Sequence, residues 1–136
     1  MLRFRSCKHG CVNSKPPTPV ANPMNQSPPQ TDNYSPHSLG VLGGGQLGRM
    51  LLAPAARLGL DVHILDPDPN CPCAGFCGQT IQGNFRDYEA VLAFGRGKDT
   101  LTIEIEDVNV DALDTLVAEG VHVAPSPVVI REIQDK

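Results

Sequence analysis

The chain has 136 residues, with 11 Lys and Arg against 15 Asp and Glu and a formal net charge of −4. This length fits a single domain. No apolar run approaches the roughly 20 residues that a membrane-spanning helix needs, so we predict no membrane partner. The lack of a long apolar segment behind the N-terminus and the odd count of five cysteines argue against a secreted, disulfide-bonded protein. Both observations favour the cytoplasm.

The charge and the prolines are unevenly distributed. Residues 1–37 hold seven of the 13 prolines, four Lys or Arg and one acid, a composition that predicts a disordered extension. An organelle-targeting segment is an open alternative for this extension. Residues 38–136 carry seven Lys or Arg against 14 Asp or Glu, a balance of −7. A domain with this excess of acids is unsuited to neutralising phosphates along a nucleic acid, so we predict no nucleic-acid partner.

Short apolar runs alternate with segments of helical spacing from Ser38 onward. We expect strands at 38–42, 62–65, 80–82, 101–105 and 121–124. We expect helices at 47–58, around 88–92, at 111–119 and from 128 onward. Because parallel neighbours need crossover connections, this alternation predicts an α/β domain with a Rossmann-like parallel sheet flanked by helices. Pro54 lies inside the first helix and predicts a kink near residues 50–54.

Three glycines follow the first expected strand. Gly43, Gly45 and Gly48 form a G-x-G-x-x-G pattern between a strand and a helix, where the amides at a helix start attract an anion. Asp66 lies 18 residues past Gly48 and could hold a ribose hydroxyl, which keeps an NAD(P)-binding oxidoreductase domain as an alternative. A turn or helix-cap acid is the interpretation of Asp66 that we favour.

The fourth expected strand ends in acidic residues. Alternation along 101–105 predicts that Glu104 and Glu106 share a face with Thr102, at the carboxyl edge of the sheet where ligands of such folds bind. Carboxylates there would repel a pyrophosphate and would suit a ligand that offers hydroxyl or amine donors. A solvated strand end is the alternative without function.

The cysteines do not predict a metal site. Two groups lie close in sequence, namely Cys7, His9 and Cys11, and Cys71, Cys73 and Cys77. Neither group has the paired Cys-x-x-Cys spacing of a tetrahedral zinc site. We therefore interpret them as loop and half-buried thiols and predict no metal ligands.

Three longer strings carry a family resemblance. They are GVLGGGQLGRM at 40–50, LTIEIEDVNVDAL at 101–113 and PSPVVIREIQDK at 125–136. Together they resemble the N-terminal, pre-ATP-grasp domain of the 5-(carboxyamino)imidazole ribonucleotide synthases of purine biosynthesis, over residues 39–136 and in the family's order. The glycine pattern alone would not be specific.

The resemblance implies an ATP-dependent carbon–nitrogen ligase of the ATP-grasp superfamily. Such enzymes use ATP and Mg²⁺ to activate bicarbonate and carboxylate the exocyclic amine of 5-aminoimidazole ribonucleotide. By this resemblance, Gly45, Gln46, Leu47 and Glu104 would bind the ribonucleotide, and Lys136 would contact ATP. The Mg²⁺ ligands and the catalytic residues would lie in a domain that this chain lacks.

The resemblance also implies a domain arrangement. We expect an extension at 1–37, a pre-ATP-grasp domain at 38–125 and the start of a linker helix at 126–136. A fragment without the ATP-grasp domains should show negligible ligase activity, because phosphoryl transfer depends on positioning and charge stabilisation by groups in those domains. The full-length enzyme is expected to be a homodimer. By this resemblance, Asp107 stands where relatives commonly have His. Besides the ligase domain and the NAD(P)-binding domain, a truncated fold that binds nothing tightly is a third functional alternative.

Overall fold

The computed structural model describes residues 36–136. The predictions of organelle targeting and for the first cysteine group concern residues outside this range, as does the predicted disorder of residues 1–35. At the end of the predicted extension, the carbonyl of His37 accepts a hydrogen bond from the amide of Asp61 at 3.0 Å, so the ordered domain begins slightly earlier than predicted. The strands are β1 (Ser38–Leu42), β2 (Asp61–Asp66), β3 (Gln79–Gln82), β4 (Thr100–Ile103) and β5 (His122–Ala124). The helices are α1 (Gln46–Arg57), α2 (Tyr88–Gly95), α3 (Val110–Ala118) and α4 (Pro127–Gln134). None of these helices has the length and apolar character needed to cross a membrane.

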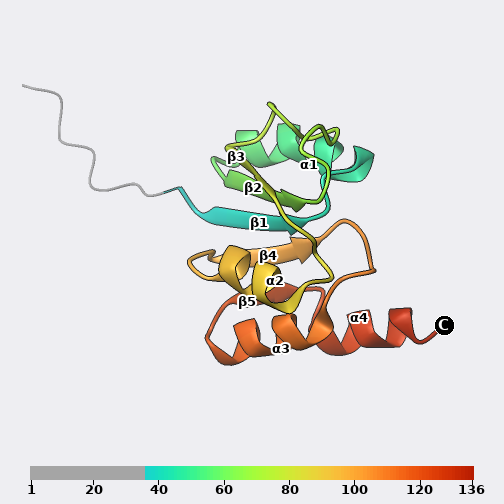
Figure 1. Ribbon diagram of the computed structural model, residues 1–136. Coiled ribbons are helices and arrows are strands. Elements are labelled where there is room, and N and C mark those ends of the chain that lie inside the picture. The colour runs from blue at the N-terminus through green and yellow to red at the C-terminus, as the bar shows by residue number, and fades with distance from the viewer. Residues whose placement is uncertain (1–35) are drawn as a thin grey trace, which may run out of the picture. The chain divides into compact units, whose positions relative to one another are not determined.

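All strand pairs are parallel, in the order β3-β2-β1-β4-β5 (Figure 1). The predicted α/β sheet is therefore confirmed. The chain builds outward from β1 to β2 and β3 and then crosses to β4 on the other side of β1. The carboxyl ends of β1 and β4 thus flank a topological switch point, the place in an open parallel sheet where ligands bind.

The two faces of the sheet are covered unequally. Helices α2, α3 and α4 pack on one face, which we call the three-helix face, whereas α1 covers the other, the α1 face (Figure 1). The core of the three-helix face contains Leu42, Leu65, Val91, Leu92, Phe94, Leu101, Val108, Val110, Ala112, Leu113, Leu116, Val123 and Ile130. The core of the α1 face contains Leu39, Val41, Leu52, Ala55, Val62, Ile64, Cys71 and Cys73.

The strand expected at 101–105 is shorter than predicted, since β4 ends at Ile103. Ile103 pairs with Leu42, the last residue of β1, and β5 pairs only as far as Thr102. Beyond these residues the chain has no neighbouring strand to extend the ladder. Ile105 still packs against the core of the three-helix face, but the alternation does not continue to Glu106, which is exposed.

Helix α1 continues through Pro54 as one helical segment. Proline lacks the amide hydrogen that would bond to the carbonyl four residues earlier, so the kink near residues 50–54 stays a prediction. The helix ends at Arg57, and Gly59 follows in the left-handed conformation, with φ of 70°. This conformation is the usual one for a glycine that terminates a helix.

Candidate functional site

The glycine loop after β1 is held by bonds from its first two amides. The amide of Gly43 donates to the carbonyl of Leu65 at 2.9 Å. The amide of Gly44 donates to Oδ2 of Asp66 at 2.7 Å, and Oδ1 of Asp66 accepts from the amide of Asp68 at 2.8 Å. Asp66 therefore organises the turn, as we favoured, with both carboxylate oxygens bonded to backbone amides. This arrangement counts against a ribose-binding role and hence against the NAD(P) alternative.

Helix α1 begins differently from α2 and α3. The cap residues Asp87 and Asn109 accept hydrogen bonds from Ala90 and Ala112, both amides in the first turn of their helices. The cap residue of α1 is Gly45, which has no side chain to accept such a bond. The first turn of α1 therefore presents backbone amides and the positive end of the helix dipole without a capping side chain.

Glu104 faces this helix start from the end of β4. Its amide donates to the carbonyl of Leu42 at 2.8 Å, which fixes the residue beside the end of β1. Its side chain is half-buried and lies against the glycines: a Cβ placed on Gly45 would collide with Oε1, and one on Gly43 would lie 2.8 Å from Oε2. Gly45 thus lacks a side chain where the Glu104 carboxylate needs the space.

A cavity of about 440 Å³ opens beside this carboxylate on the α1 face. It runs along β4 from Thr100 to Glu104, and its other lining residues come from β1, α1 and β5, including Leu39, Leu47 and Ala124. Leu47 is 67% exposed although it is apolar. The cavity is mostly apolar with one carboxylate at its edge, a combination suited to an organic ligand with a few polar groups.

The second predicted carboxylate, Glu106, lies elsewhere. It lines a separate hollow of about 610 Å³, together with Arg86, Asn109, Arg131 and Gln134. The expectation that Glu104 and Glu106 would share one face is therefore wrong, because the chain bends after Ile103. Asp107 forms an ion pair with Arg86 at the rim of this second hollow.

The structure brings Gly45, Gln46, Leu47 and Glu104 together, whereas Lys136 belongs to another region. Lys136 is exposed and follows α4, whose Ile130 is buried in the core of the three-helix face. The roles assigned to these residues by resemblance stay predictions.

The segment after β2 supports the glycine loop, a role that the sequence alone did not predict. The amide of Cys73 donates to the carbonyl of Gly44 at 3.0 Å, and its thiol lies 3.7 Å from the carbonyl oxygen of Gly45. Burial, with smaller contributions from nearby Cys71 and Cys77, raises the pKa of the Cys73 thiol to about 11. The cysteine spacing carries no signal for this contact, because it joins segments that lie far apart in the sequence.

Comparison with known proteins identifies the family of this chain. Residues 37–134 match the family described as the ribonucleotide synthetase preATP-grasp domain. The chloroplastic phosphoribosylaminoimidazole carboxylase of Vigna aconitifolia is 42% identical over 98 residues, which cover 72% of this chain and 18% of that protein.

Solved structures give the same match. The N5-carboxyaminoimidazole ribonucleotide synthetase of Thermotoga maritima superposes with a TM-score of 0.68 at 35% identity, covering 72% of this chain and 27% of that one. The Aspergillus clavatus N5-carboxyaminoimidazole synthase, solved with ADP and 5-aminoimidazole ribonucleotide, has a TM-score of 0.63 at 43% identity, covering 73% of this chain and 26% of that one. The chain thus spans about a quarter or less of the length of these relatives.

The parallel sheet, with its switch point between β1 and β4, defines a Rossmann-like class of α/β domain. Within that class, the chain belongs to the pre-ATP-grasp domain family of the N5-carboxyaminoimidazole ribonucleotide synthases.

Proposed function

We propose that residues 38–136 bind the ribonucleotide substrate of an ATP-dependent N5-carboxyaminoimidazole ribonucleotide synthase. The single observation that carries this proposal is the Glu104 carboxylate lying against Gly45, opposite the uncapped start of α1. The helix-start amides of Gln46 and Leu47 suit the phosphate of a nucleotide. A carboxylate on the other side of the same site suits its hydroxyl or amine donors.

The Aspergillus clavatus relative supports the choice of ligand, because it was solved in complex with 5-aminoimidazole ribonucleotide. A pyrophosphate is a poorer match for this chain. The Gly44 amide is already bonded to Asp66, and the Glu104 carboxylate would repel a second negative phosphate.

The reaction that we propose for the whole enzyme uses ATP and Mg²⁺ with bicarbonate. Bicarbonate would take the γ-phosphoryl group to give carboxyphosphate and ADP. The exocyclic amine of the ribonucleotide would then attack the carboxyl carbon and phosphate would leave. Residues 36–136 contain no group of three or more His, Cys, Asp or Glu placed to hold a metal ion, so we assign no Mg²⁺ step to them.

Lys136 is the residue of this chain that we propose as an ATP contact, as a point charge near the phosphates. Because the chain spans about a quarter or less of its relatives, we propose that carboxylation requires protein beyond this span and that the present chain has negligible ligase activity. We further propose a homodimeric, cytoplasmic enzyme for the whole protein. The chloroplastic location of the Vigna aconitifolia relative belongs to that protein.

Calorimetric titration of the 136-residue chain tests the ribonucleotide site. Wild-type protein should bind 5-aminoimidazole ribonucleotide and should not bind NADH. Glu104→Gln should weaken ribonucleotide binding by about tenfold or more, since hydrogen bonds to a charged acceptor are the stronger ones. Glu106→Gln is the matched control and should bind like wild type, because Glu106 lines the other hollow.

Other outcomes would select the alternatives. Tight NADH binding would favour the oxidoreductase domain. Failure to bind either ligand would favour the truncated fold without tight ligands. Equal weakening by the two substitutions would contradict the assignment of Glu104 to the site.

A further inference from the structure

The loop that carries Glu104 has few backbone bonds of its own. We call residues 104–109, between β4 and α3, the acidic loop. Three of its amides donate to backbone carbonyls: Glu104 donates to Leu42, Val108 donates to Glu106 within the loop, and Asn109 donates to Phe85. The middle of the loop therefore depends on contacts from elsewhere in the chain.

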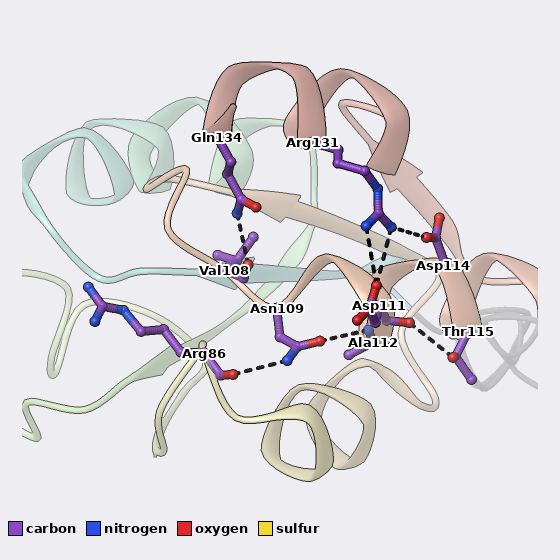
Figure 2. A network of polar contacts seen from close by, with 9 residues as sticks. All are labelled: Arg86, Val108, Asn109, Asp111, Ala112, Asp114, Thr115, Arg131 and Gln134. Atoms are coloured by element: carbon purple, nitrogen blue, oxygen red, sulfur yellow. Dashed lines mark hydrogen bonds and ion pairs between the residues drawn. The ribbon is translucent and has the colours of Figure 1, made fainter. Parts of the chain in front are cut away.

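Gln134 supplies such a contact from the last turn of α4. Its side-chain nitrogen donates to the carbonyl of Glu106 at 2.7 Å and to the carbonyl of Val108 at 2.9 Å. Figure 2 shows the Gln134 side chain reaching down from α4 to Val108. The NH₂ of the amide carries two donors, one for each carbonyl, whereas the amide oxygen could donate to neither, so the NH₂ faces the loop.

Arg131, one turn earlier on α4, makes a different connection. Its guanidinium pairs with Asp111 and Asp114 of α3, as Figure 2 shows. Helix α4 is thus joined to α3 through Arg131 and to the acidic loop through Gln134. These two connections can be broken separately, because they share no partner residue.

The opposite side of the acidic loop is held by contacts that do not involve α4. The Asn109 side-chain nitrogen donates to the carbonyl of Arg86 at 3.1 Å (Figure 2), and the Arg86 guanidinium pairs with Asp107. Gln134 therefore supplies the hydrogen bonds between the loop and α4, in addition to the shared apolar core of Val108 and Ile130, while Arg86 and Asn109 join the loop to the segment before α2.

We infer that Gln134 is a positioning residue for Glu104. By holding the carbonyls of Glu106 and Val108, it keeps the acidic loop in the conformation that sets the Glu104 carboxylate against Gly45. The contact makes the site sensitive to the position of α4. The effect on ligand affinity rests on the proposed function, whereas the effect on the loop does not. Functional side chains need such support, because a loosely held group loses its geometry.

The test compares four forms of the 136-residue chain: wild type, Gln134→Met, Gln134→Lys and Arg131→Met. Methionine keeps the length of the Gln134 side chain and removes its donors, whereas lysine keeps donors. Arg131→Met is the matched control on the same helix. Amide hydrogen exchange, followed by NMR, reports opening of the loop at Val108 and Asn109. The Gly45 amide resonance reports the nearby Glu104 carboxylate.

We expect Gln134→Met to speed exchange at Val108 and Asn109 by about tenfold and to shift the Gly45 resonance. Gln134→Lys should restore much of the protection, and Arg131→Met should leave the loop amides unchanged. Unchanged exchange in Gln134→Met, or equal effects of Gln134→Met and Arg131→Met, would overturn the inference.

Titration with 5-aminoimidazole ribonucleotide completes the test. We expect Gln134→Met to weaken binding several-fold and Gln134→Lys to recover part of the loss. Faster loop exchange and a shifted Gly45 resonance with unchanged affinity would overturn the positioning role. If wild type does not bind, the proposed function fails, and the exchange and resonance measurements still decide whether Gln134 holds the loop and Glu104.

Discussion

The two faces of the sheet differ in the size of their apolar cores and in how completely helices cover them. The three-helix face buries a large apolar core under α2, α3 and α4, including Leu113 and Leu116, which are fully buried. The α1 face has a smaller core under one helix and the segment that carries Cys71 and Cys73. Beside that helix, over β4 and β5, lies the cavity with Glu104 at its edge.

Because of this difference, we expect one face to contribute most of the stability and the other to bind the ligand. Burial of apolar surface stabilises the fold roughly in proportion to its area, so the three-helix face should dominate the free energy of unfolding. The incompletely covered α1 face leaves room for a ligand at the switch point between β1 and β4. Substitutions on the three-helix face should therefore lower stability more than ligand affinity. Substitutions around the cavity on the α1 face should lower ligand affinity more than stability.

The largest effect on stability should come from the three-helix face. Leu116→Ala removes a fully buried side chain that packs against Gly95 and should lower the free energy of unfolding by about 2–5 kcal/mol. Leu52→Ala, on the α1 face and 9% exposed, should cost less. Urea unfolding followed by circular dichroism measures both. Equal costs would contradict the unequal division of the core.

The largest effect on binding should come from Gly45→Ala. The backbone at Gly45 has φ of −71°, which alanine adopts without strain. The added Cβ would displace the end of the Glu104 side chain, which is flexible. We expect affinity for 5-aminoimidazole ribonucleotide to fall by about tenfold or more, with little change in the urea midpoint.

A double-mutant cycle controls this experiment. In a Glu104→Ala background, Gly45→Ala should have little further effect on ribonucleotide affinity, since the displaced carboxylate is already absent. Additive losses would show that Gly45 acts through a different contact.

The thiol under the glycine loop should give a smaller, pH-dependent effect. The pKa of Cys73 is raised by burial from 9.0 to about 11. A pKa raised by folding stabilises the folded state fully below the unfolded value, and this contribution is lost as pH rises through the folded value. The urea midpoint should therefore fall between pH 9 and 11, and it should fall less in Cys73→Ala. Equal falls in the two proteins would contradict this account.

The smallest effect is expected at the opposite end of the strands from Glu104, next to Leu39 and Thr100 at the far end of the cavity. The Ser38 amide and hydroxyl donate to the Asp99 carboxylate, and these bonds lower its pKa from 3.8. A lowered pKa stabilises the fold above the unfolded value, and this contribution is lost as pH falls below it. The stability difference between wild type and Asp99→Asn should therefore narrow below about pH 4. Ribonucleotide affinity at neutral pH should not change, and a change there would break the separation between the two regions.

Much of the fold could be predicted because its signals are local. Apolar runs and glycine or proline breaks predicted the strands and helices, and their alternation predicted a parallel sheet. The end of β4 could not be read from residues 101–105, because it is set by where β1 and β5 stop offering partners. Alternation alone therefore predicted the wrong surface for Glu106.

The site was predictable only in part, for a similar reason. Gly45 and Glu104 follow two neighbouring parallel strands, and the ends of such strands meet at one edge of the sheet. The supports of the site come from distant segments. Cys73 reaches the glycine loop from beyond β2, and Gln134 reaches the acidic loop from α4. Neither spacing nor composition encodes these contacts.

An NMR titration of the labelled 136-residue chain with 5-aminoimidazole ribonucleotide would show whether Glu104 and the start of α1 form a ribonucleotide site. We expect saturable shifts centred on the amide resonances of Gln46, Leu47 and Glu104 that are lost in Glu104→Gln, and unchanged resonances in the helices of the three-helix face. Shifts centred instead on the hollow lined by Arg86 and Arg131, or none at all, would contradict this assignment.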